Sequence, residues 1–362
     1  MFNNIYKTLF TMIFILCFLS CDNSTEPTKE EEESPQYPEL VEVASSGYLW
    51  TGVAVSNEGR IFVCFPRWSR PIQMSVAELV GTTMTAHPYP NEEWNNWYGG
   101  VTAFDHFVCV QSVYIDNENY LWILDTGNPQ LEGVIERGAK LIKIDLSTNT
   151  IIDLFELGFS DTDTYLNDVR IDNTKDYAYT TDSGVGAICV VDILSGDKRV
   201  LLFLDASTKA EDIILNIEGI PYSRTVHSDG LAIDPAGEYL YYQALRARNL
   251  YRINTRWLSI RDTVLKEAEL KDKVEHVIQS GASDGIEFGP DGNLYLTSIE
   301  ENAIKRYTVS GTLETVIADS RIKWPDSFSI TSDTTIYFTI SQVHRISNPS
   351  GLFMLYKIRP YD

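Results

Sequence analysis

Residues 228–242 read SDGLAIDPAGEYLYY. A short apolar run, a Pro/Gly turn and an aromatic-rich run in this order predict a β-hairpin. Residues 283–296 repeat the pattern as SDGIEFGPDGNLYL. Looser copies bring the total to six, with successive starts 42 to 61 residues apart at Gly52, Ser112, Asp168, Asp229, Asp284 and Asp326.

Six copies of one short β-unit predict radial repetition, because a single small sheet cannot bury both of its faces alone. The predicted fold class is all-β, a six-bladed β-propeller forming one domain over residues 39–362. We expect strands at 40–44 and 352–358 to share one blade, because mixing the N- and C-terminal strands closes the ring. Third strands are expected at 140–145, 187–192, 249–253 and 303–307, and fourth strands at 151–155 and 199–204.

Three longer segments interrupt the repeat. Residues 74–96 contain Pro88 and Pro90 and are interpreted as an irregular insertion. Residues 206–217 have room for one or two helical turns. In residues 256–279, apolar residues recur at near-helical spacing between Lys and Glu. This pattern predicts an amphipathic helix packed on the rim of the ring, with a partner-binding helix as the alternative.

The chain is strongly acidic, with 29 basic and 51 acidic residues among 362 and a formal charge of −22. A phosphate backbone would be repelled, so nucleic acid is excluded as a partner. The protein is expected to be a monomer. Cys64, Cys109 and Cys189 lie in strand-like contexts without metal-ligand spacing, which predicts buried thiols, while a disulfide between two of them stays open.

The N-terminus carries a targeting signal. Residues 1–20 contain an apolar run that is too short to span a bilayer and suits a signal peptide. The run ends in Leu19-Ser20-Cys21, which resembles a bacterial lipobox and predicts lipidation at Cys21; an ordinary cleaved signal is the alternative. Residues 21–38 are acidic and proline-bearing, which predicts a disordered tether. The expected location is extracytoplasmic, as a lipoprotein at the cell envelope or surface, with the lipid as the only membrane contact.

Candidate site residues follow from the propeller geometry, because the inner strands begin, and the second strands end, at the same mouth of the channel. The strand starts bring Gln111, Asn167, Asp168, Ser228, Asp229, Ser283, Asp284 and Asp326 to this mouth, and the strand ends bring Asp125, Thr126, Asp182, Ser183, Gln243 and Ser298. Such a ring of carboxylates and amides suits a cation or a polar or amine ligand. Each Asp has an alternative role as a cap that binds backbone N–H groups.

Two basic groups stand near this mouth. His227 precedes Asp229, and a His with a near-neutral pKa can serve as general base or acid beside Asp229; a structural His is the alternative. Arg246 and Arg248 are placed to meet a ligand carboxylate or to pair with surface Glu. No nucleophile elbow, Walker loop, zinc spacing or dinucleotide fingerprint is present in the sequence.

Several blocks resemble the yellow/major royal jelly protein family. They are Val63-Cys64-Phe65-Pro66-Arg67-Trp68, Leu121-Trp122-Ile123-Leu124-Asp125-Thr126-Gly127, Leu166-Asn167-Asp168-Val169, Ser228-Asp229-Gly230 and Trp324-Pro325-Asp326-Ser327-Phe328, within a match over about 48–358. The resemblance implies a secreted six-bladed propeller with a ligand pocket at the centre of one face. Members of the family include small-molecule binders and proteins credited with dopachrome conversion.

A more distant similarity is to gluconolactonase-type lactonases, which hold a divalent cation with Glu, Asn and Asp. Asn167 and Asp229 match two of these ligands, which implies a Ca²⁺ site, but Trp50-Thr51-Gly52-Val53 stands where the Glu is expected. We therefore expect a propeller that binds a small polar or aromatic ligand at the channel mouth. The alternatives are an enzyme, either a dopachrome-like isomerase or a metal-dependent lactone hydrolase, and a protein-interaction scaffold.

Overall fold

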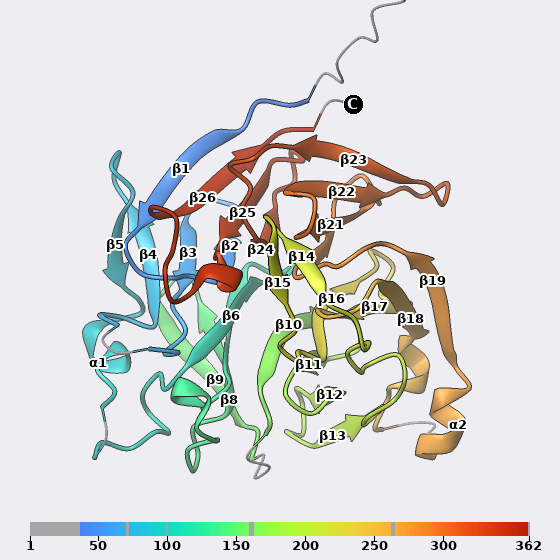
Figure 1. The fold of residues 1–362 in the computed structure, drawn as a ribbon. Helices are drawn as coiled ribbons and strands as arrows, with labels where there is room; N and C mark the ends of the chain where they lie inside the picture. Colours follow the sequence, from blue (N-terminus) through green and yellow to red (C-terminus); the bar gives the residue numbers. More distant parts are fainter. Residues whose placement is uncertain (1–36, 70–71, 99, 159–162, 262–264, 361–362) are drawn as a thin grey trace, which may run out of the picture. The chain divides into compact units, whose positions relative to one another are not determined.

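A computed structural model describes residues 37–69, 72–98, 100–158, 163–261 and 265–360. These residues form six four-stranded antiparallel sheets, or blades, around a central channel (Figure 1). Adjacent inner strands contact one another around the ring, and each blade extends outward from its inner strand. The predicted six-bladed β-propeller is therefore confirmed.

In the first five blades, sequence order runs from the inner strand to the outer strand. Blade 1 consists of β2 (Val53–Val55), β3 (Ile61–Cys64), β4 (Val76–Val80) and β5 (Thr85–Pro88). Blade 2 consists of β6 (Val110–Ile115), β7 (Tyr120–Asp125), β8 (Lys140–Asp145) and β9 (Thr150–Glu156). Blade 3 consists of β10 (Leu166–Asp172), β11 (Tyr177–Asp182), β12 (Ala187–Asp192) and β13 (Lys198–Leu201).

Blade 4 consists of β16 (Ser228–Ile233), β17 (Tyr239–Ala244), β18 (Asn249–Asn254) and β19 (Val274–Gln279). Blade 5 consists of β20 (Ile286–Phe288), β21 (Leu294–Ser298), β22 (Ala303–Tyr307) and β23 (Leu313–Ala318). The expected third strands at 140–145, 187–192, 249–253 and 303–307 all lie at these positions.

Blade 6 closes the ring with strands from both ends of the chain. It consists of β24 (Pro325–Ile330), β25 (Ile336–Ile340), β26 (Phe353–Ile358) and, as its outer strand, β1 (Val41–Ser46). β1 is antiparallel to β26, with Ser45 opposite Met354. The predicted terminal closure is thus confirmed, and it covers the edge that β26 would otherwise expose.

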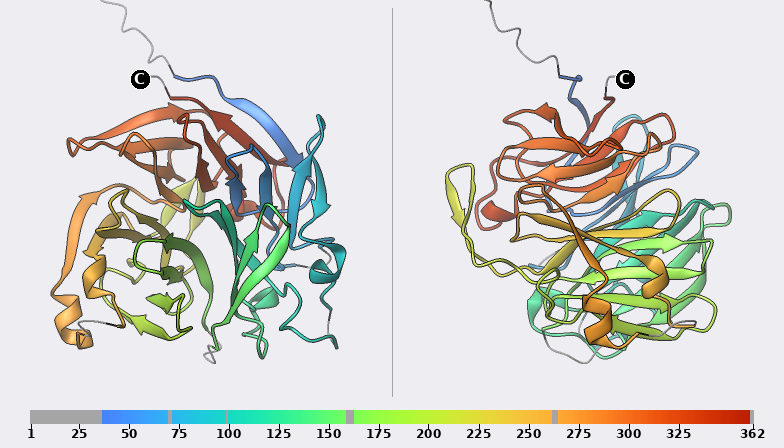
Figure 2. Two further views of the ribbon diagram at one scale, coloured as in Figure 1. Left: turned by 180° about the vertical axis from the view of Figure 1, so that it is seen from behind. Right: turned by 90° about the vertical axis from the view of Figure 1, so that its right-hand side faces the viewer.

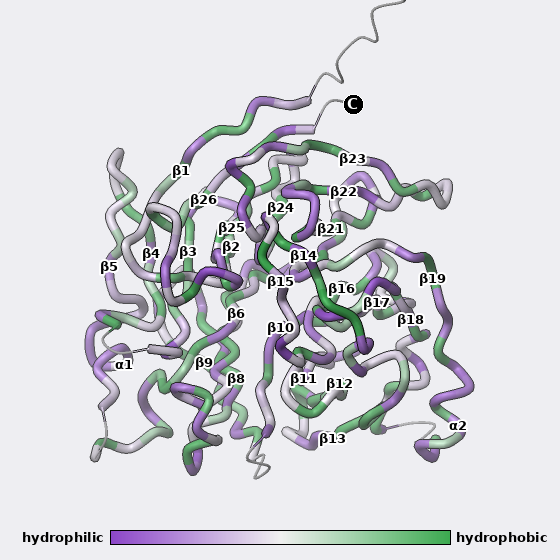
Figure 3. Tube along the Cα trace, in the orientation of Figure 1, coloured by the Kyte–Doolittle hydropathy of each residue, from purple (hydrophilic) through white to green (hydrophobic). Residues whose placement is uncertain are grey.

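The core lies between neighbouring blades, because middle strands such as β7, β11 and β12 bury both faces. In β7, Leu121 and Ile123 pack toward blade 1, whereas Trp122 and Leu124 pack toward blade 3. Side chains of a strand alternate between its two faces, so a strand buried on both sides reads as a nearly continuous apolar run. Figure 3 shows these apolar runs within the strands and more hydrophilic connections between them.

Two of the expected insertions differ from their predicted structure. Residues 74–96 supply β4, β5 and a short helix, α1 (Glu92–Asn95), so the irregular insertion was wrong. The outer strand β5 is only four residues long and ends at Pro88. Such a short segment shows no clear alternation of apolar and polar residues, so the sequence did not predict a strand here. Residues 206–217 contain no helix: turns lead there into β14 (Leu215–Ile217), so the helical turns expected for this segment were also wrong.

The long amphipathic helix predicted for 256–279 was wrong as well. The described part of this segment contains a 3₁₀ turn, η2 (Thr255–Trp257), a five-residue helix, α2 (Glu267–Lys271), and the outer strand β19. Pairing of β19 with β18 supplies backbone hydrogen bonds and overrides the near-helical spacing. Leu258 and Leu270 are nevertheless buried in the core between blades 3 and 4.

A two-stranded hairpin, β14 with β15 (Ile220–Tyr222), stands outside the six blades. It is inserted between blades 3 and 4 and lies at the central opening, and the side view shows it projecting from one face of the ring (Figure 2). Its tip residue, Glu218, has a positive φ of 51° and contacts η3 (Val343–Arg345) in the last blade. The hairpin therefore reaches across the mouth.

The signal peptide, Cys21 and most of the predicted tether lie outside the described residues. Tyr37 and Pro38, which the prediction placed in the tether, are half-buried and buried, and Tyr37 packs on the core between blades 5 and 6. Within the described ranges no helix has the length and apolarity to cross a membrane. Cys64, Cys109 and Cys189 are buried free thiols, and burial raises the pKa of Cys64 and Cys109 to about 12.

Candidate functional site

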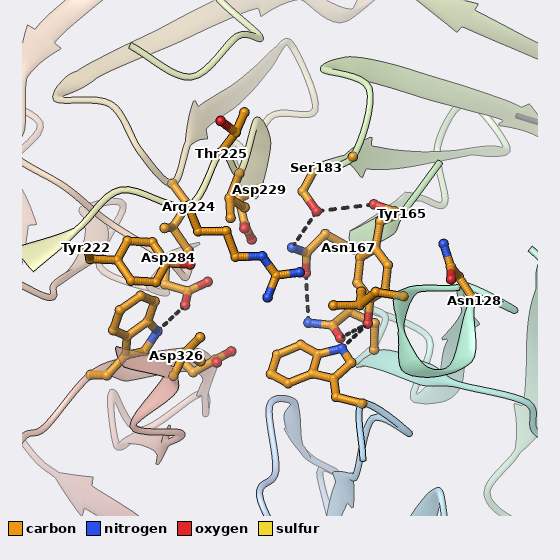
Figure 4. Close-up of a pocket in the computed structure, with 18 of the residues that line it drawn as sticks. Asn128, Tyr165, Asn167, Ser183, Tyr222, Arg224, Thr225, Asp229, Asp284 and Asp326 are labelled. Atoms are coloured by element: carbon orange, nitrogen blue, oxygen red, sulfur yellow. Dashed lines mark hydrogen bonds between the residues drawn. The ribbon is translucent and has the colours of Figure 1, made fainter. Parts of the chain in front are cut away.

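A pocket of about 250 Å³ lies at the mouth where the inner strands begin (Figure 4). This volume lies just below the range of about 300–1,000 Å³ that is common for ligand sites, so the pocket suits a small ligand. Its polar lining comes from Gln111, Asn128, Asp163, Asn167, Ser183, Arg224, Thr225, Asp229, Asp284 and Asp326, and its aromatic lining from Trp68, Tyr165, Tyr222 and Trp324.

One wall of the pocket is a neutral hydrogen-bond network. Gln111 Nε2 donates to Asn167 Oδ1 over 3.0 Å, and Asn167 Nδ2 donates to Ser183 Oγ over 3.2 Å. Tyr165 Oη donates to Gln111 Oε1 over 2.8 Å and accepts a hydrogen bond from Trp68 Nε1. Both ends of the Asn167 amide are therefore used by neighbours, which fixes its orientation.

The opposite wall is acidic. Asp229, Asp284 and Asp326 are 3%, 8% and 5% exposed, and all three face the pocket. Trp324 Nε1 donates to Asp284 Oδ2 over 2.6 Å. Burial, with the neighbouring carboxyl groups as a further cause, raises the pKa of each of these three residues well above its ordinary value. Asp229 and Asp284 are among the groups that shift each other's pKa, and the raised pKa favours the protonated form of these carboxyl groups.

The glycine of the repeated Ser-Asp-Gly sequence explains how these carboxyl groups come together. A Cβ atom on Gly230 would lie 2.2 Å from the backbone oxygen of Asp284, and one on Gly285 would lie 2.1 Å from that of Asp326. Only glycine allows the backbones to approach this closely. Successive inner strands thus pack tightly at their starts, and their Asp side chains follow one another around the mouth.

The hairpin contributes a residue that the sequence analysis missed. Arg224 follows β15 and extends across the pocket between Asp284 and Asn167 (Figure 4). It is exposed, and among the described residues it forms no ion pair and no side-chain hydrogen bond. Arg224 lies in the connection leading into β16, four residues before Ser228. This position was the only indication in the sequence that Arg224 lies at the pocket.

The aromatic lining was missed as well. Tyr222 contacts Trp324 edge-to-face, with ring centroids 5.0 Å apart, and Trp324 stacks on His344 at 5.6 Å. Trp68 and Tyr165 stand by the neutral wall. Trp68 and Trp324 belong to blocks quoted for the family resemblance, which was the available signal for these two residues.

Six of the residues predicted at this mouth line the pocket, namely Gln111, Asn167, Ser183, Asp229, Asp284 and Asp326. Asp168 lies beside it, where its Oδ1 accepts hydrogen bonds from Ser112 Oγ at 2.9 Å and from Arg170 at 3.0 Å. The same Arg170 is paired with Glu287 at 2.9 Å. Asp168 is therefore held in an ion-pair network below the pocket floor.

Asp125 and Asp182 act as backbone caps. Asp125 accepts from the N–H groups of Val108, Cys109 and Gly127 and pairs with the fully buried Lys140 at 3.0 Å. Asp182 Oδ1 accepts from the N–H groups of Tyr165, Gly184 and Val185 at 2.9 to 3.1 Å. These aspartates hold the loops that carry the pocket and do not line it.

The remaining predicted residues also lie outside the lining. Gln243 binds Ser280 Oγ and the Gly281 carbonyl, and Arg246 donates to the Ser223 carbonyl. Ser228 and Ser298 are buried, and Arg248 pairs with Glu300 at 2.8 Å.

His227 is half-buried, and its Nδ1 accepts a hydrogen bond from Ala210 N at 2.9 Å. Burial, and after it Lys209 and Arg246, lowers the pKa of His227. The residue does not belong to the pocket lining, so any proton transfer in the pocket would fall to the carboxyl groups that line it.

The pocket residues do not fit a complete divalent-cation site. In the described part of the chain, no cluster of three or more His, Cys, Asp or Glu side chains is arranged to hold a metal ion. Asn167 Oδ1, the atom that would face a cation, already accepts from Gln111. At the position of the missing Glu, Thr51 is buried and its hydroxyl donates to the Gln111 carbonyl.

The fold and the pocket define a class of protein: a six-bladed propeller with a small polar and aromatic pocket at one mouth of its channel. The family model described as major royal jelly protein matches residues 108–357. The chain belongs to the major royal jelly protein family. A comparison with curated proteins by sequence finds no match.

Solved propellers share the fold at low identity. A gluconolactonase from Xanthomonas campestris is 12% identical, with a TM-score of 0.56 over 89% of this chain and 90% of that one. A luciferin-regenerating enzyme is 10% identical, with a TM-score of 0.56 over 90% and 97%. A calcium-binding regucalcin from Agrobacterium tumefaciens is 15% identical, with a TM-score of 0.51 over 88% and 96%. These similarities establish the propeller architecture.

Proposed function

We propose that this propeller binds a small polar or aromatic molecule in the mouth pocket. The observation that carries the proposal is the carboxyl group of Asp229, which is 97% buried, faces the pocket and has only the Asp284 carboxyl as a side-chain partner among the described residues. Leaving a buried carboxyl without N–H donors is costly. A ligand N–H or O–H group would supply the missing donor, and the aromatic lining would cover the rest of the molecule.

A thermal-shift panel tests this proposal. The panel contains polar aromatic molecules, amines, sugars and sugar lactones, with and without Ca²⁺, and hits are confirmed by calorimetry. Binding should be weakened at least tenfold by Asp229→Asn, because the ligand loses a charged acceptor. Asp333→Asn, an exposed acidic residue at the opposite end of the inner strands, is the matched control. If no compound raises the melting temperature of the wild-type protein, the proposal of small-molecule binding is wrong and the protein-interaction scaffold is favoured.

A second candidate function is proton-transfer catalysis on the bound molecule. It is favoured by the neighbouring Asp229 and Asp284, because two buried carboxyl groups with a raised pKa in one pocket can act as acid and base. The reaction class that suits it is isomerisation, including the dopachrome-type reaction suggested by the family resemblance. Assays of dopachrome conversion with Asp284→Asn test it: turnover by the wild type that is lost at least 100-fold in the variant supports an enzyme.

Lactone hydrolysis through a cation is a weaker alternative, because the pocket lacks the third ligand. If Ca²⁺ stabilises the wild-type protein and this effect disappears in Asp229→Ala, metal-dependent lactone hydrolysis is supported. Absence of any Ca²⁺ effect in both proteins would remove it.

For the location, we propose that the mature chain is held at the outer side of a membrane by a lipid on Cys21. Support comes from the apolar run and the Leu-Ser-Cys sequence that follows it. Metabolic labelling with a fatty acid in a bacterial host should mark the wild type and not Cys21→Ser. We further propose a monomer that does not bind nucleic acid, which sedimentation and a DNA-binding assay will test.

A further inference from the structure

Among the described residues that line the pocket, Arg224 is the one cation beside four carboxyl groups. It reaches into the middle of the pocket, and no ion pair joins it to any described carboxylate. An arginine is a strong and geometrically selective binder of carboxylates, through paired N–H···O bonds. An unpaired guanidinium over a pocket of an otherwise acidic chain therefore marks a place for an anionic group of a ligand.

The acidic wall beside Arg224 suits a cationic group of a ligand. Asp229 and Asp284 are buried neighbours, and the nearest charged groups that affect them are other carboxyls. A ligand ammonium would allow both to ionise, because an opposite charge within about 4–6 Å favours the charged form of a carboxyl. The ammonium has three donors, which match several acceptor oxygens at this wall.

Much of the remaining lining is aromatic and aliphatic. Tyr222 and Trp324 form an edge-to-face pair on the acidic side, and Trp68 stands on the other side. Leu131, Val226, Leu245 and Val343 complete the apolar surface. A flat or bulky apolar group of a ligand can lie here while its charged groups contact Arg224 and the acidic wall.

We propose that the ligand is a free amino acid with an aromatic or large apolar side chain. Its carboxylate binds Arg224, and its ammonium binds the Asp229–Asp284 pair. This inference rests on the proposed small-molecule binding and narrows it to one ligand class. An aromatic amine would leave Arg224 unpaired beside a second cation, whereas an aromatic acid would leave Asp229 without an N–H donor. Of these three ligand types, only a zwitterion supplies a partner both for Arg224 and for the acidic wall.

Calorimetry with two matched ligand series tests the proposal at neutral pH. The first series is 2-phenylethylamine, L-phenylalanine and 3-phenylpropionate, and the second is tryptamine, L-tryptophan and indole-3-propionate. Within each series, the ring and its linker stay constant while one charged group is removed. We expect the amino acid to bind at least tenfold more tightly than either single-charge analogue, since each charged hydrogen-bonded contact contributes at least that factor.

Two variants test which pocket residue binds which charged group of the ligand. Arg224→Gln should lower amino acid affinity at least tenfold and should not weaken binding of the amine. Asp229→Asn should lower the affinity for both the amino acid and the amine. Arg256→Gln is the matched control, because Arg256 lies over Trp257 at the outside of blade 4 and should change no affinity.

Two outcomes would overturn the inference. If the amine binds as tightly as the amino acid, or if Arg224→Gln has no effect, the zwitterion is wrong while ligand binding in the pocket stands. If neither series binds, the amino acid class is wrong, and the broader panel of polar and aromatic compounds decides separately whether the pocket binds any small molecule.

Discussion

At the scale of single residues, the same residue type serves two purposes in this propeller. Asp125 and Asp182 end their strands by capping backbone N–H groups, whereas Asp229 and Asp284 turn toward the pocket. The difference lies in the supply of donors. A carboxylate with several backbone N–H partners is satisfied by its own loop, whereas Asp229 has no N–H partner of this kind among the described residues and is left to a ligand.

The pH dependence of stability should report the buried carboxyl pair. Because the pKa of Asp229 and Asp284 is raised in the folded protein, the folded state binds more protons than the unfolded state above about pH 4. Their contribution to the free energy of unfolding is therefore present at low pH and lost as pH rises through the raised pKa. Asp229→Asn should flatten this fall and gain about 1 kcal/mol or more at pH 7, since one pKa unit corresponds to about 1.4 kcal/mol.

Chemical denaturation between pH 4.5 and 8 measures this effect. Asp333→Asn provides the comparison, because its carboxyl is 56% exposed and its pKa is lowered, chiefly by a hydrogen bond from Thr331. Equal pH slopes for wild type and Asp229→Asn would show that the pKa of Asp229 is not raised.

The buried ion pair of Lys140 and Asp125 should be a large structural contributor. Lys140 is fully buried, and besides Asp125 it donates to the carbonyls of Ala103 and Gly138, at 2.8 and 3.0 Å. Removing one partner leaves the other as an unpaired buried charge. Asp125→Ala should therefore lower the free energy of unfolding by about 3–5 kcal/mol. Thermal and urea unfolding measure this. The double variant Asp125→Ala/Lys140→Met should recover part of the loss, and no recovery would argue against the ion pair as the cause.

At the scale of elements, the inserted hairpin completes the pocket. β14 and β15 lead directly into Tyr222 and Arg224, and the tip is held by Glu218, whose Oε2 accepts from His344 at 2.9 Å and from Arg345 at 3.0 Å. Burial acts to raise the pKa of Glu218, but these two hydrogen bonds outweigh it and the pKa is lowered. The site thus depends on an element that belongs to no blade.

Loosening the tip should affect the hairpin without unfolding the propeller. Glu218→Gln removes the charge that holds His344 and Arg345, and the contact is partly exposed, so the global stability should change by no more than about 1 kcal/mol. Hydrogen exchange in residues 215–222 should rise several-fold. Glu275→Gln, which breaks an exposed pair with Arg252 on blade 4, is the control. Unchanged exchange in the hairpin would mean that its apolar contacts alone hold it.

At the scale of the whole molecule, the ring depends on its closure. The last blade takes three strands from the C-terminal end and one from the N-terminal end, and β1 covers the outer edge of β26. The two ends of the propeller are thereby held in one sheet.

Removal of the closing strand should destabilise the entire ring. A shortened chain that begins at Gly47 lacks β1 and exposes the edge of β26, so it should unfold roughly 10 °C lower or aggregate through the open edge. A chain that begins at Tyr37 keeps the strand and should match the full-length protein. Thermal unfolding and gel filtration distinguish the two, and equal stability would show that β1 is not needed for closure.

Sequence alone determined the architecture, because six period-two hairpins, two of which begin with Asp-Gly, have few ways to bury their faces other than stacking around an axis. It also predicted that Asn167, Asp229 and Asp284 face one opening, since inner-strand starts converge there. It failed for outer strands such as β5 and β19, which are short, half-exposed and defined by pairing. Only the tertiary structure separated capping aspartates from pocket aspartates and placed Arg224 over the mouth, because both depend on which donors and loops from distant parts of the chain come into reach.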